Sequence, residues 1–78
     1  MSNIREAVIE IITREEDLEE SQVVQDNHLE HMDSLDKMAL ECAIEREFDI
    51  TFYNDEFDNL NTITELVDMI KIEQAADK

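Results

Sequence analysis

The sequence predicts an all-α protein, a four-helix bundle with three main helices, a short third helix and a long first loop. The chain has 78 residues and contains neither glycine nor proline. Tight hairpin turns between strands favour glycine, so a sheet of hairpins is disfavoured. Several segments instead carry apolar residues at the three-and-four spacing of an amphipathic helix. The length fits one domain, residues 1–78, with one modest core.

The first helix is expected from Asn3 to Arg14, because Asn3 can cap it and Glu6 follows three residues later. Its apolar face comprises Ile4, Ala7, Val8, Ile11 and Ile12. Residues 15–32 then form a long, acidic connection, which in a small domain is either functional or wrongly assigned. Its apolar residues, Leu18, Val23, Val24 and Leu29, are expected to contact the core.

The second helix is expected from Ser34 to Phe48 and carries two apolar stripes. One stripe contains Leu35, Met38, Ala39 and Cys42, and the other contains Leu40, Ile44 and Phe48. At about 100° per residue the two stripes lie on roughly opposite sides of the helix. A bundle helix needs one stripe, so the second predicts either burial against a third element or an apolar surface for a partner.

The chain after this helix predicts a buried loop over residues 50–53 and then a short helical turn ending near Asn59. Asn54 and Asp55 are expected to cap that turn, with Phe57 and Leu60 pointing inward.

The last helix is expected to begin at Thr62, which forms a capping-box pattern with Glu65. Its apolar face comprises Ile63, Leu66, Val67 and Ile70, and the tail after Glu73 is expected to fray.

The charge of the chain limits its partners. Lys and Arg number 6 against 22 Asp and Glu, a formal net charge of −16. Such a surface repels nucleic acid and acidic membranes and attracts basic patches on proteins. The single cysteine, Cys42, excludes an internal disulfide and indicates a reducing compartment. We expect a cytoplasmic monomer without a signal peptide or membrane span.

Asp33-Ser34-Leu35 is the most informative stretch, and around it the chain resembles the acyl carrier protein family. The family's Asp-Ser-Leu segment opens its second helix, and here the surrounding residues are Glu30-His31-Met32-Asp33-Ser34-Leu35. Residues 45–50, Asp55-Glu56 and residues 60–63 also fit the family's pattern, so the resemblance covers essentially the whole chain. His31 stands where the family has glycine and Tyr53 where it has proline, which indicates a specialised member serving a dedicated pathway.

The resemblance implies a carrier without catalysis of its own. A phosphopantetheinyl transferase would move 4'-phosphopantetheine from coenzyme A to Ser34, with Asp33 helping it to hold metal and substrate. The arm would carry acyl groups for fatty acid, polyketide or related lipid biosynthesis. The positive end of a helix also favours a phosphodiester at Ser34. From the residues alone, Ser34 or Asp33 could instead be only a helix cap.

Two further sets of residues are candidates for function. An acidic and apolar strip along the second helix is expected to dock transferases, acyl-loading enzymes and synthases through their basic patches. The strip comprises Leu35, Asp36, Met38, Glu41, Cys42 and Glu45. An acyl pocket, weighed against a plainly packed core, would be lined by Leu40, Ile44, Phe48, Phe52, Phe57, Leu60 and Ile70.

Other functions remain as alternatives. The chain could carry aminoacyl or peptidyl groups, or it could be an unmodified acidic protein that binds a basic partner. A metal site is disfavoured because only His28, His31 and the distant Cys42 are at hand, and an EF-hand needs a glycine that the chain lacks.

Overall fold

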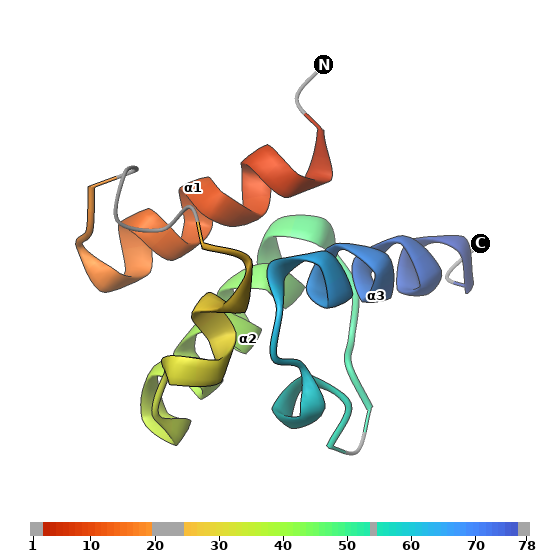
Figure 1. Ribbon diagram of the computed structural model, residues 1–78. Coiled ribbons are helices and arrows are strands. Elements are labelled where there is room, and N and C mark those ends of the chain that lie inside the picture. The colour runs from red at the N-terminus through yellow and green to blue at the C-terminus, as the bar shows by residue number, and fades with distance from the viewer. Residues whose placement is uncertain (1–2, 20–24, 54, 77–78) are drawn as a thin grey trace.

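The computed structural model describes residues 3–19, 25–53 and 55–76, and within these ranges it is helical without a strand (Figure 1). The elements in chain order are α1 (Ile4–Glu16), η2 (Asp26–His31), α2 (Ser34–Phe48), η3 (Phe57–Asn59) and α3 (Ile63–Ala76). The two η elements are short 3₁₀ helices. The predicted all-α fold with three main helices is therefore confirmed.

Helix α1 begins as its sequence predicts. The Oδ1 atom of Asn3 accepts a hydrogen bond from the N–H of Glu6 at 2.7 Å. The helix ends at Asp17, whose backbone is left-handed with φ 54° and ψ 45°. Asp is one of the few residues other than glycine that adopt this conformation readily. The helix thus extends two residues past the predicted end at Arg14.

Helix α2 begins and ends at the predicted residues. Asp33 caps its N-terminus, and Asp49 ends it with a left-handed backbone, φ 55° and ψ 50°. A chain without glycine therefore uses aspartate to end both α1 and α2.

The core lies where α1 packs against α2 and α3, and the two 3₁₀ helices pack around it. In Figure 1, α1 lies across one side of α2 and α3. The Phe52 and Phe57 rings pack against each other, with centroids 5.3 Å apart and planes at 55°. The most deeply buried large side chains are Phe57, Ile12, Leu29, Leu40, Ile44, Ile63, Leu66, Ile70 and Val8.

The described end of the first connection is helical, which the sequence did not predict. Residues 26–31 form η2, which places Leu29 fully in the core, while Leu18 packs partly against it. Val23 and Val24 lie outside the described residues. The element was missed because a single buried apolar residue in six gives no helical period.

The segment between α2 and α3 differs in part from expectation. Ile50 and Phe52 are buried as predicted, but Tyr53 is 61% exposed. Capping of η3 by Asp55 is wrong, because its N-cap is Glu56, which makes no side-chain cap hydrogen bond. The Glu56 carboxylate instead accepts the N–H of Tyr53 at 2.8 Å. Asn54 lies outside the described residues.

Helix α3 starts with the predicted capping box. The hydroxyl of Thr62 accepts the N–H of Glu65, and the Glu65 carboxylate accepts the N–H of Thr62, both at 3.0 Å. The backbone N–H groups of Asn61 and then Thr62, which donate to this carboxylate, hold the pKa of Glu65 below its usual range. The helix continues to Ala76, three residues past Glu73.

Asp26 connects η2 to both α1 and α3. Its Oδ1 atom accepts hydrogen bonds from the Thr64 hydroxyl at 2.9 Å, the Thr64 N–H at 3.0 Å and the Arg5 guanidinium at 3.1 Å. The hydrogen bonds from Thr64, and then the Arg5 side chain, lower the pKa of Asp26. The ionised carboxylate therefore favours the folded state.

Asp26→Asn is expected to reduce the free energy of unfolding at pH 7 by up to about 1 kcal/mol, since the site is partly exposed. The folded pKa of Asp26 is depressed, so its contribution is present above the unfolded value of about 3.9. That contribution is lost as the pH falls through the folded pKa. Urea unfolding of both proteins at stepped pH checks this, and the difference should vanish at the acid end. Glu30→Gln, an exposed charge on the same element, is the control.

Candidate functional site

Ser34 is the first residue of α2, and its side chain is exposed. The preceding residue takes the capping role: Oδ1 of Asp33 accepts the N–H of Asp36 at 2.9 Å, and its main-chain oxygen accepts the N–H of Lys37 at 3.0 Å. Of the two residues considered as possible caps, Asp33 is the cap and Ser34 is not, so the Ser34 hydroxyl is not needed to begin the helix. The N–H groups of Ser34 and Leu35 precede the first helical hydrogen bond and lie at the positive end of α2.

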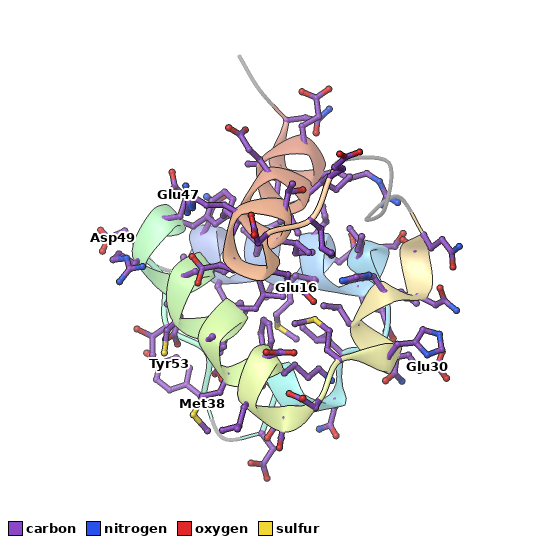
Figure 2. The ribbon with its side chains drawn as sticks, turned by 90° about the vertical axis from the view of Figure 1, so that its left-hand side faces the viewer. Glu16, Glu30, Met38, Glu47, Asp49 and Tyr53 are labelled. Atoms are coloured by element: carbon purple, nitrogen blue, oxygen red, sulfur yellow. The ribbon has the colours of Figure 1, made fainter. Side chains whose placement is uncertain are left out.

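An exposed apolar surface adjoins this serine. Leu35 is 76% exposed and Met38 59% exposed, and Ala39 and Cys42 are exposed on the same face. This face is the stripe of α2 that begins with Leu35 in the sequence analysis, and it is exposed rather than buried. In Figure 2, Met38 and Tyr53 project from the same side of the molecule.

The acidic residues of the predicted strip differ in their surroundings. Asp36 is exposed beside Ser34, whereas Glu41 and Glu45 are half-buried. Burial raises the pKa of Glu41, and the neighbouring charges of Glu45 and Asp58 raise it further. Glu45 also has a structural role, because its carboxylate accepts the N–H of Phe52 at 2.8 Å.

Lys37 is a feature that the sequence analysis missed. Its side chain is buried, with 9% exposed, and its Nζ donates to the main-chain oxygen of Asp58 at 3.0 Å. The signal was available: Lys37, Leu40 and Ile44 follow the three-and-four spacing of a single buried face. The aliphatic stem of a lysine can lie along apolar surface while its ammonium reaches a polar atom.

The residues expected to line an acyl pocket come together in one core cluster. Six of them are buried, and Phe48 packs against the others while remaining half-exposed. The buried members are Leu40, Ile44, Phe52, Phe57, Leu60 and Ile70.

The two histidines lie in or beside η2 and contact other side chains. The His28 Nε2 atom lies 2.8 Å from Oε2 of Glu16, which joins η2 to the end of α1. His31 is exposed, with Nε2 3.4 Å from Nδ2 of Asn27. Within the described ranges, no group of three or more His, Cys, Asp or Glu side chains is placed to hold a metal ion.

Comparison with known proteins bears on this site directly. The family model for the phosphopantetheine attachment site matches residues 6–70. Acyl carrier proteins from two strains of Buchnera aphidicola subsp. Acyrthosiphon pisum, Tuc7 and 5A, are each 32% identical over 74 residues, which cover 91% of this chain and 92% of the relative. No solved structure gives a significant match.

Two further properties are the length of the helices and the extent of the family match. In the described part of the chain, none of the helices is both long and apolar enough to span a membrane. The matched region contains α2, the serine at its start and almost all of the core. The chain therefore belongs to the acyl carrier protein family: it is a carrier rather than a catalyst, and its cofactor is 4'-phosphopantetheine.

Proposed function

We propose that Ser34 is the attachment point of the arm and that the chain carries acyl groups as thioesters for fatty acid, polyketide or related lipid biosynthesis. One observation carries this proposal: Ser34 is exposed at the first position of α2, and Asp33 caps the helix in its place. A transferase can thus reach the hydroxyl without disturbing the fold.

The surroundings of Ser34 fit a phosphodiester. The N–H groups of Ser34 and Leu35 point out of the helix end, and such an end stabilises an anion by about 0.3–1 kcal/mol. The Asp33 carboxylate opposes this charge but is held against the N–H of Asp36. By the family resemblance, Asp33 helps the transferase to hold metal and substrate.

Attachment requires one bond to form and one to break. The Ser34 oxygen bonds to the phosphorus that carries pantetheine in coenzyme A, its proton leaves to a base of the transferase, and the nucleotide part of coenzyme A departs. The chain contributes the hydroxyl and its placement, and the transferase contributes the catalysis. Once bound, the arm supplies a thiol that can hold an acyl group.

The strip beside Ser34 is the proposed docking surface. Leu35 and Met38 offer exposed apolar contact area, and Asp36 adds charge next to the serine. With a net charge of −16, the chain is expected to steer enzymes with basic patches toward it. Cys42, Glu41 and Glu45 extend the strip along α2.

The relatives favour an acyl cargo over an aminoacyl one, because the proteins that match are named acyl carrier protein. The match to the phosphopantetheine attachment model disfavours the other alternative, an unmodified acidic protein that binds partners without using the Ser34 hydroxyl.

The test is to incubate the purified protein with a broad-range phosphopantetheinyl transferase and coenzyme A. Intact mass spectrometry should show the addition of one phosphopantetheine group, and peptide mapping should place it on Ser34. An unchanged mass of the folded protein, or a modification at another residue, would contradict the proposal.

A further inference from the structure

Lys37 occupies a position that the carrier function does not explain. Among the described residues it is the one buried polar or charged side chain, with 9% exposed. It lies three residues, or about one helical turn, after Ser34. Leu40 and Ile44, the next residues on the same face of α2, are fully buried in the core. Lys37 therefore marks the boundary between the attachment site and the core.

The ammonium of Lys37 joins two elements at this boundary. It donates to the main-chain oxygen of Asp58 in η3 at 3.0 Å, so the side chain crosses from α2 to η3. Glu41, one turn further along α2, has neighbouring charge from Asp58 and lies at the same junction. The hydrogen bond of Lys37 thus joins α2 to η3 about one helical turn after Ser34.

The core residues of α2 and η3 next to Lys37 are buried. Leu40, Phe57 and Leu60 are 1%, 1% and 6% exposed. Because the Lys37 side chain reaches from α2 to η3, an acyl chain on an arm at Ser34 that entered the core between these two elements would displace it. Its ammonium would then lose the Asp58 oxygen, and a charged group that loses its buried partner is costly.

We propose that Lys37 is a gate that closes the route from Ser34 to the core, so that this carrier keeps its cargo outside the bundle. The inference rests on Ser34 being the attachment point. It makes Lys37 a specificity-determining residue: short or polar acyl groups suit the carrier, because a long apolar chain gains no shelter in the bundle. The six buried residues predicted to line an acyl pocket would then serve as packing.

The test compares acetyl and octanoyl groups loaded on the arm and measures the rate at which hydroxylamine cleaves each thioester. Rates are divided by those of the same acyl groups on free pantetheine, which removes their intrinsic reactivity. In the wild-type protein the two corrected rates should agree within about twofold, less than the effect of burying one methylene group. In Lys37→Ala the octanoyl thioester should be cleaved roughly tenfold more slowly than the acetyl thioester, the effect of burying about two methylene groups.

Lys71→Ala is the matched control, because it removes an equal charge from an exposed position on α3. It should behave like the wild-type protein. If hydroxylamine cleaves the octanoyl thioester of the wild-type protein much more slowly than the acetyl thioester, the gate proposal is wrong. This measurement does not require any variant to fold. Equal cleavage of both thioesters in a folded Lys37→Ala would also overturn it. Failure to load Ser34 at all would instead contradict the proposed function, so the two failures are distinguishable.

Discussion

Ser34→Ala is expected to abolish the addition of phosphopantetheine while leaving the fold intact. Alanine has no hydroxyl oxygen to bond to phosphorus, so the mass of the protein should not change with transferase and coenzyme A. The substitution removes an exposed side chain, and Asp33 continues to cap α2 through the N–H of Asp36. The free energy of unfolding should therefore change by no more than about 0.5 kcal/mol.

Ser21→Ala is the matched control, since it removes another of the chain's serine hydroxyls. This variant should be loaded to the same extent as the wild-type protein. Circular dichroism of all three proteins should show the same helix content. Loading of a folded Ser34→Ala would move the attachment point elsewhere, and partner binding that survives Ser34→Ala would favour the unmodified interaction protein.

The features that the sequence predicted best are those fixed by neighbouring residues. The caps of α1 by Asn3 and of α3 by Thr62 with Glu65 involve residues three apart, and the structure shows both. The bounds of α2 were also predicted, because apolar residues recur throughout it and Phe48 closes the pattern. Such signals are complete within one or two helical turns.

The features that were missed depend on distant parts of the chain. Element η2 is held by Asp26, whose partners are Arg5 on α1 and Thr64 on α3. The burial of Lys37 depends on a main-chain oxygen in η3, 21 residues away. No local pattern identifies this partner oxygen, although the spacing of Lys37 with Leu40 and Ile44 does indicate a buried face.

The candidate site divides in the same way. The exposed serine with its acidic neighbour follows from three consecutive residues and was predicted. The two stripes of α2 were also recognised, and the sequence analysis assigned the stripe with Leu35 and Met38 to docking and the stripe with Leu40 and Ile44 to the interior. Their burial agrees with this assignment, because Leu40 and Ile44 are buried in the core while Leu35 and Met38 stay exposed.

Leu35→Ala is expected to lower kcat/KM for transferase loading by roughly tenfold, the effect of losing most of one well-buried apolar side chain at an interface. Leu35 directly follows Ser34 and is 76% exposed, so an enzyme that reaches the serine must cover it. Because it has little contact with the core, its removal should leave the thermal midpoint nearly unchanged.

Ile72→Ala is the matched control, because Ile72 is 61% exposed but lies on α3 rather than on α2. Its loading kinetics should match those of the wild-type protein. Equal losses for the two variants would mean that the apolar face of α2 is not the docking surface, while Ser34 could still be the attachment point. A loss of kcat/KM confined to Leu35→Ala would support the apolar face of α2 as the docking surface. If the same substitution lowers kcat/KM less in a short peptide that carries only the serine segment, the enzyme recognises the folded face itself. This outcome would assign a function to the exposed apolar stripe of α2, because an exposed apolar patch that does not contribute to the core commonly marks a surface that a partner covers.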